Sequence, residues 1–266
     1  MKRTILSAVI ALCAVIIFIP APSGAMSLGV GATTWYAWWQ PAWAEGESTG
    51  VGPGSFDWEI DPAFMGGPLL ILGFPGGFSL SSVMYIGKYE SSAALSALGE
   101  SWHREILKYD IDTTLSYRVT QMISVFAGAK VLGFRFDETM ETGFGNMNSE
   151  SSFDGYGPGI GASITMPVSN SFFISAGLSF LYTLNSYKAN DPFGLSLSTD
   201  VTGYGCNTTL SLLYNLADYN TVISTGFRYQ FITFSQEESV PGFFDYDGRK
   251  DHFYGVTVSV IYTFNL

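Results

Sequence analysis

The chain has 266 residues and carries more acidic than basic side chains, 23 against 12, for a formal net charge of −11. This acidic balance argues against nucleic acids and other phosphate-rich surfaces as partners. The composition is 47% hydrophobic and only 13% charged, well below the charged share of a typical soluble domain. Something other than water is therefore expected to face much of the surface.

The first 25 residues have the three parts of a secretory signal peptide in the expected order. Lys2 and Arg3 give a positive start, an apolar stretch covers 5–19, and a segment of small residues ends at Ala25. The apolar stretch is shorter than the roughly 20 residues that a membrane-spanning helix needs, so cleavage after Ala25 is preferred over an uncleaved anchor. We expect a signal peptide over 1–25 and a mature domain over 26–266, whose net charge falls from −11 to −13 without the two basic residues.

Apolar and polar residues alternate with a period of two through the mature chain, and no later segment keeps a helical period. The pattern is clear around residue 110, again from residue 172, and over 254–266. Lipid can be crossed without helices only by a closed barrel, so the pattern predicts an all-β, transmembrane, antiparallel up-and-down β-barrel. A secreted β-sandwich is the alternative fold, and the apolar face on nearly every strand disfavours it.

Short and long connections alternate along the chain. Tight turns are expected at 73–77, 118–121, 169–171 and 217–220, where the alternation breaks briefly. Longer polar stretches near 40–55, 91–100, 138–152, 186–196 and 236–250 are expected to be loops at the opposite end. Four short and five long connections join about ten strands, with both chain ends on the periplasmic side. Eight strands are the alternative, because Pro62 and Pro68 weaken one of the ten.

Aromatic residues recur about eight positions apart on the apolar faces, as from Tyr109 to Tyr117. Eight steps of a tilted strand rise roughly 20 Å, close to the height of the apolar band between two aromatic girdles. The residues expected at the lipid interface are Tyr109, Tyr117, Tyr182, Tyr214, Tyr254, Tyr262 and Phe264.

A second group of aromatic residues clusters near the outer end of the first strand. It consists of Trp35, Tyr36, Trp38, Trp39 and Trp43. Such rings can stack on sugars or bind a partner, but an interfacial belt is the preferred interpretation.

The signal peptide, the alternating hairpins and the closing strand over 253–266 together resemble the bacterial outer-membrane β-barrel superfamily, including its small porin-like members. The resemblance covers the whole mature chain and is a pattern, not a motif. It implies a place in the cell outer membrane of a Gram-negative-type envelope, with outer-membrane lipid around the barrel. It also implies assembly by the barrel-assembly machinery through the C-terminal strand, which ends here in Leu266, with Phe264 as the nearest aromatic residue.

Charges of both signs occupy positions that the alternation directs into the lumen. They are Lys108, Asp110, Asp112, Arg118, Lys130 and Arg228, and the uncharged polar residue Gln230 lies with them. Because buried charges must pair to offset their desolvation, we expect an ion-pair network that plugs a narrow barrel. The alternative is a narrow polar passage with a charged constriction, which small inward residues such as Gly157 and Gly159 would favour.

The outer rim offers one hypothesis of catalysis. The chain has two histidines, His103 and His252, and their parity points both outward at the level of the lipid headgroups. Asp251 stands beside His252, and an acid next to a histidine can orient it to activate water, which gives the hypothesis of a rim hydrolase. The omptin proteases resemble this arrangement in strand number and in rim acids and histidines, but their paired motifs on two loops have no match here.

The sequence therefore predicts a barrel that is membrane-structural or forms a narrow passage for small solutes. No catalytic, cofactor or metal site is predicted. The alternatives are a surface-binding barrel that acts through acidic, aromatic extracellular loops on an unidentified ligand, and the rim hydrolase of Asp251 and His252.

Overall fold

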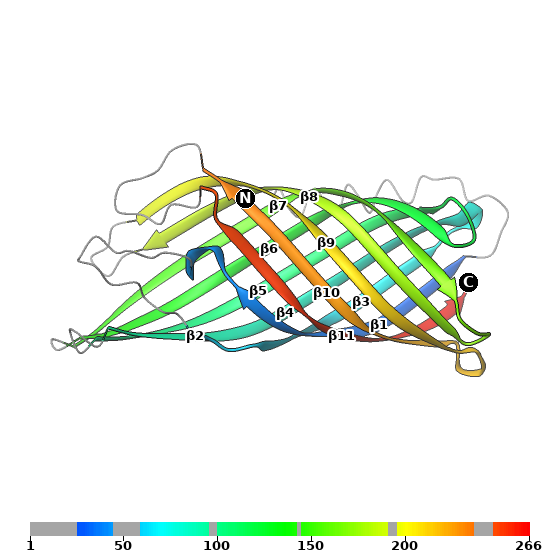
Figure 1. Ribbon diagram of the computed structural model, residues 1–266, viewed down its shortest axis with the longest axis horizontal. Coiled ribbons are helices and arrows are strands. Elements are labelled where there is room, and N and C mark those ends of the chain that lie inside the picture. The colour runs from blue at the N-terminus through cyan, green and yellow to red at the C-terminus, as the bar shows by residue number, and fades with distance from the viewer. Residues whose placement is uncertain (1–25, 45–58, 96–99, 143–144, 191–195, 237–246) are drawn as a thin grey trace.

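The computed structural model describes residues 26–44, 59–95, 100–142, 145–190, 196–236 and 247–266 (Figure 1). Within them, ten long antiparallel strands form one closed sheet. The strands are β1 (Ser27–Gln40), β3 (Ala63–Gly73), β4 (Phe78–Leu95), β5 (Glu100–Arg118), β6 (Ile123–Thr142), β7 (Gly145–Pro167), β8 (Phe172–Asn190), β9 (Ser196–Leu216), β10 (Thr221–Ser235) and β11 (Lys250–Asn265). This confirms the predicted ten-strand barrel, while the expected signal peptide over 1–25 lies outside the described residues.

Each long strand pairs with its neighbours along the chain, and β1 also pairs with β11, which closes the barrel. A two-residue strand, β2 (Glu59–Ile60), pairs with β4 and is separated from β3 by Asp61 and Pro62. Proline has no N–H to donate to a neighbouring strand, so the break falls at the position where the sequence predicted weakness. No helix among the described residues is long and apolar enough to cross a membrane.

Four short connections lie at the same end of the barrel as the start of β1 and the end of β11. They are η2 (Pro75–Gly77), residues 119–122, residues 168–171 and η3 (Ala217–Tyr219), at the four predicted tight turns. Asn220 closes the last of them in the left-handed region, with φ +49°. At this end the N–H of Leu266 donates to the carbonyl of Met26 over 2.9 Å. Short turns mark the periplasmic end of an outer-membrane barrel.

One side of the barrel is much taller than the other. β7 has 23 residues and β6 has 20, whereas β1 has 14 and β10 has 15. About 9–11 residues of a tilted strand cross the apolar layer, so β6 and β7 continue well beyond it on the extracellular side (Figure 1).

The prediction of loops at 138–152 and 186–196 is therefore largely wrong. The pairing of β6 with β7 continues to Thr142 opposite Gly145, and the pairing of β8 with β9 continues to Asn190 opposite Ser196. These segments carry polar side chains on their outer face because the strands have left the lipid. In the sequence, polar residues of this kind cannot be distinguished from the polar residues of a loop.

The outer face carries an apolar band between two rings of aromatic side chains. The ring near the short turns contains Phe78, Tyr117, Phe172, Tyr214, Tyr262 and Phe264. The other ring contains Tyr36, Trp38, Phe64, Tyr109, Tyr156, Tyr182, Tyr204, Tyr229 and Tyr254. All seven aromatic residues expected at the lipid interface thus lie on the outer face. A closed barrel with this band is a transmembrane barrel of the cell outer membrane.

Candidate functional site in the barrel lumen

The inward side chains divide the lumen into three layers. On the short-turn side lies a cavity of about 390 Å³, here called the vestibule. Next comes the ionic layer, which consists of Lys108, Asp110, Asp112, Lys130, Arg228 and Gln230. Towards the extracellular end lies the aromatic plug, which consists of Trp39, Trp43, Tyr89, Phe134, Phe136, Phe153, Phe234 and Phe253.

Two carboxylates lie at the centre of the ionic layer. Asp110 and Asp112 are two residues apart on β5 and therefore point to the same side of the strand. Lys130 on β6 approaches both, with its Nζ 2.5 Å from Asp110 Oδ1 and 3.0 Å from Asp112 Oδ1. Arg228 reaches them from β10, across the barrel, and its Nη2 lies 2.7 Å from Asp112 Oδ2. The ion pairs thus bridge opposite walls of the lumen.

Aromatic faces support the cations of this layer. Lys108 is fully buried, and its Nζ lies 3.9 Å from the ring centre of Phe253 and 4.4 Å from that of Phe134. The guanidinium of Arg228 lies 4.8 Å from the ring centre of Trp35. A desolvated cation over an aromatic face gains about 2 kcal/mol or more. These contacts offset part of the cost of burying Lys108, whose nearest carboxylate oxygen is 3.8 Å away on Asp110.

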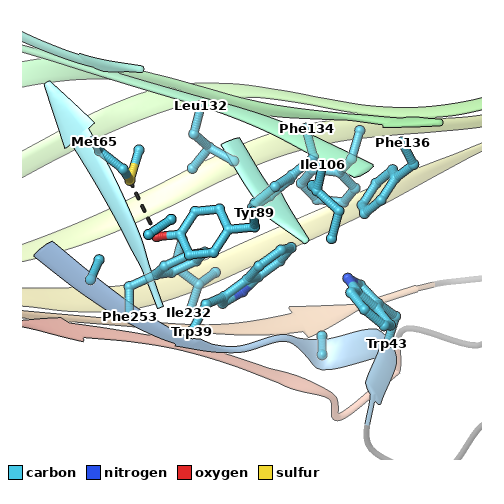
Figure 2. Packing of buried hydrophobic residues seen from close by; sticks show 14 of the residues in the cluster. Trp39, Trp43, Met65, Tyr89, Ile106, Leu132, Phe134, Phe136, Ile232 and Phe253 are labelled. Carbon is cyan, nitrogen blue, oxygen red and sulfur yellow. Dashed lines mark hydrogen bonds between the residues drawn. The ribbon is translucent and has the colours of Figure 1, made fainter. Parts of the chain in front are cut away.

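The rings of the aromatic plug pack against one another inside the barrel (Figure 2). Trp39 stacks on Phe134 and Phe253, with ring centres 4.8 and 5.1 Å apart. The hydroxyl of Tyr89 donates to the sulfur of Met65 over 3.4 Å, as the dashed line in Figure 2 marks. Packed rings leave little space for water, so this layer separates the vestibule from the extracellular side.

The interpretation of the tryptophan cluster as a lipid-facing belt is therefore wrong for three of its members. Trp35, Trp39 and Trp43 are buried inside the barrel, and only Tyr36 and Trp38 lie on the outer face. The signal that separates them is the alternation itself, because Trp35 and Trp39 share one parity of β1 and the outward residues share the other. Their closeness in sequence hid this difference.

A short segment after β1 folds into the lumen and completes the plug. It is η1 (Ala42–Ala44), and the backbone N–H of Ala42 donates to Asp251 Oδ1 over 2.6 Å in a buried position. Its Trp43 packs edge to face on Trp39. Arg104 lies over the ring of Trp43, with its guanidinium carbon 4.3 Å from the ring centre. Asp251 is thus a positioning residue for this segment of the plug.

Small hydroxyl side chains are the most frequent group among the residues that line the vestibule. They are Thr33, Ser81, Thr114, Ser116, Ser163, Ser179, Thr209, Ser211, Ser224, Thr257 and Ser259. Some of these hydroxyls bond to each other across strands, as Thr33 does with Ser259 over 2.7 Å. Gly128, Gly159 and Gly177 also line the space. The small inward residues seen in the sequence therefore do leave room, on the periplasmic side of the ionic layer.

Arg118 was expected in the lumen network, and the structure corrects this. It is the last residue of β5 at the short-turn end and is exposed. Among the described residues it forms no ion pair with Asp110 or Asp112. The alternation assigned Arg118 to the inward face of β5. At the exposed end of the strand, however, a side chain on the inward face is not buried.

Replacing Arg118 by alanine is expected to change the free energy of unfolding by less than about 0.5 kcal/mol, because exposed side chains away from a network contribute little. Urea unfolding of the refolded barrel in detergent micelles measures this. A loss above about 1 kcal/mol would show that Arg118 takes part in a stabilising contact.

The histidines and the rim acid do not form a dyad. Asp251 faces the lumen beside the plug, while His252, its neighbour on β11, lies on the outer face. There the Nδ1 of His252 and the hydroxyl of Tyr229 share a hydrogen bond of 2.9 Å. His103 is exposed on β5. Consecutive residues of a strand point to opposite faces, so this acid cannot orient this histidine.

No cluster of histidine, cysteine and acidic side chains that could hold a metal ion occurs among the described residues. The lumen offers instead an ion-paired layer of three cations and two carboxylates, which has packed rings on one side and a cavity on the other. This arrangement can hold the walls of the barrel together and can exclude water and ions.

No family model matches the sequence, and no curated protein matches it. Solved structures similar to this one include the outer-membrane protease OmpT of Escherichia coli, with 10% identity, coverage of 91% of this chain and 95% of that chain, and a TM-score of 0.48. The translocator domain of the autotransporter NalP of Neisseria meningitidis has 11% identity, coverage of 98% and 97%, and a TM-score of 0.47. The toluene transporter TodX of P. putida has 9% identity, coverage of 92% and 91%, and a TM-score of 0.36. Their roles differ from one another, and none of them assigns a role to this chain.

Proposed function

We propose that this protein is a closed, membrane-structural barrel of the outer membrane whose lumen does not conduct in its resting state. The observation that carries the proposal is the plug stacked on the ionic layer. Trp39, Phe134 and Phe253 come from three different strands and meet in the lumen, where Lys108 of the ionic layer lies over two of the rings. An apolar layer without a water path opposes ion passage by excluding water.

The ionic layer suits this role better than that of a selectivity filter. A conducting constriction presents charges to water and to passing ions, whereas Lys108 and Asp110 are fully removed from solvent. Their charges are directed at each other and at ring faces. Such a network joins β5, β6 and β10 across the lumen and opposes changes in the cross-section of the barrel.

The narrow passage remains the alternative within the same barrel, and single-channel recording separates the two. Mature protein that has been refolded and inserted into planar bilayers is expected to give no discrete conductance steps. Heat-modifiable migration on gels confirms that the protein tested is a folded barrel. Regular steps from the unmodified protein would contradict the closed lumen and favour the passage.

The surface-binding alternative concerns extracellular loops, most of which lie outside the described residues. The tall wall formed by β6 and β7 would be the described part of such a surface.

A further inference from the structure

The vestibule has the size of a ligand pocket. Its volume of about 390 Å³ falls within the roughly 300–1,000 Å³ that small-molecule sites occupy. It lies between the short turns and the ionic layer, so molecules from the periplasmic side can reach it while the plug stays closed. The closed lumen does not need a space of this size.

The walls offer hydrogen bonds in a form that suits hydroxylated molecules. Side-chain hydroxyls from β1, β4, β5, β7, β8, β9, β10 and β11 line the space, and each can both donate and accept. Apolar contact comes from Leu69, Val83 and Phe126. A sugar or sugar alcohol has the matching surface, because its hydroxyl edges are polar and its C–H faces are apolar.

The deep end of the vestibule carries polar groups that are not fully used. Asp112, Lys130 and Arg228 line it, and the Nε of the nearly buried Arg228 has no hydrogen-bond partner among the described residues. Asn207 also lines the cavity, and its buried Oδ1 likewise has no partner there. Both atoms have almost no exposed area, so a small shift of the two side chains towards a ligand or a water molecule is expected to give them a partner.

The ion pairs at this end disfavour ionic ligands that would have to break them. Within the ionic layer, Asp110 and Asp112 pair with Lys130 and Arg228, at distances between 2.5 and 3.7 Å. An anion would compete with Asp112 for Arg228, and a cation would compete with Lys130 for the carboxylates. A neutral molecule can instead bond to the lining hydroxyls and to Asn207 without breaking an ion pair.

We propose that the vestibule is a binding site for a small, neutral, polyhydroxylated molecule of the sugar or sugar-alcohol class, approached from the periplasmic side. The site does not depend on conduction, because it lies on one side of the plug. A failure of the binding test and a failure of the conductance test can therefore be told apart.

Saturation-transfer NMR on the folded mature protein in detergent micelles tests this with glucose, xylitol and inorganic phosphate as probes. Saturable binding of glucose or xylitol is expected. Binding should weaken about tenfold in Asn207→Leu, as expected for the loss of one buried hydrogen bond. The matched control is Thr208→Leu, which changes the next residue of β9 on the outer face and should leave binding unchanged.

If heat-modifiable migration on gels shows that Asn207→Leu does not fold, Thr209→Val is the second variant. It removes a lining hydroxyl at nearly constant volume and is expected to weaken binding in the same way. The proposal is overturned if neither neutral probe binds saturably, if phosphate alone binds, or if the folded vestibule variants bind as the wild type does.

Discussion

Replacing Asp110 by alanine is expected to lower the free energy of unfolding by about 3–5 kcal/mol, the cost of breaking a buried ion pair from one side. Asp110 is fully buried and is approached by Lys108, Lys130 and Arg228. Without it, Asp112 is the one carboxylate left in the ionic layer to neutralise three buried cations. Urea unfolding of the refolded protein, followed by tryptophan fluorescence and by heat-modifiable migration, measures the change.

Two further variants separate charge from packing. Arg118→Ala is the matched control on the same strand, because it removes a charge that lies outside the ionic layer. The double variant Asp110→Leu/Lys130→Met removes both partners of a pair and keeps apolar volume, so it should lose less stability than Asp110→Ala. If the free energy of unfolding of Asp110→Ala lies within about 1 kcal/mol of the wild-type value, the ionic layer does not hold the walls together.

The fold could be predicted because the lipid acts on every strand in the same way. Each membrane-level segment must show one apolar face, so a period of two appears from Leu107 to Tyr117 and from Tyr254 to Leu266. The same rule placed Lys108, Asp110, Lys130 and Arg228 in the lumen, where the structure brings them together. The rule ceases to apply where a strand leaves the lipid, and the errors at Arg118 and at 138–152 both lie beyond that point.

The aromatic plug could not be recognised from composition. Buried rings such as Trp39 and lipid-facing rings such as Trp38 are equally apolar and differ only in the side of the strand on which they stand. The partners of Trp39 lie far away in sequence, on β6 and β11, so no local sequence pattern predicts that these rings stack. The buried hydrogen bond from Ala42 to Asp251 is equally non-local and involves a backbone donor that sequence does not mark.

Truncating the plug is expected to turn the silent barrel into a conducting one. In the double variant Trp39→Ala/Phe134→Ala, the two stacked rings disappear and Lys108 loses one of its two aromatic faces. Water can then reach the ionic layer from the extracellular side as well as from the vestibule, and ions can follow. We expect discrete, small conductance steps in planar bilayers. We also expect a loss of stability of about 3–5 kcal/mol for each ring removed from a packed core.

The matched control is Phe180→Ala/Tyr182→Ala, which removes two rings of β8 that face the lipid at 61% and 48% exposure. These rings have no part in the lumen, so this variant should insert and stay silent. Conductance in both variants would point to general loosening of the barrel and not to the plug. Silence of a folded, inserted Trp39→Ala/Phe134→Ala protein would contradict the prediction, because the ionic layer and the remaining rings would then suffice to close the lumen.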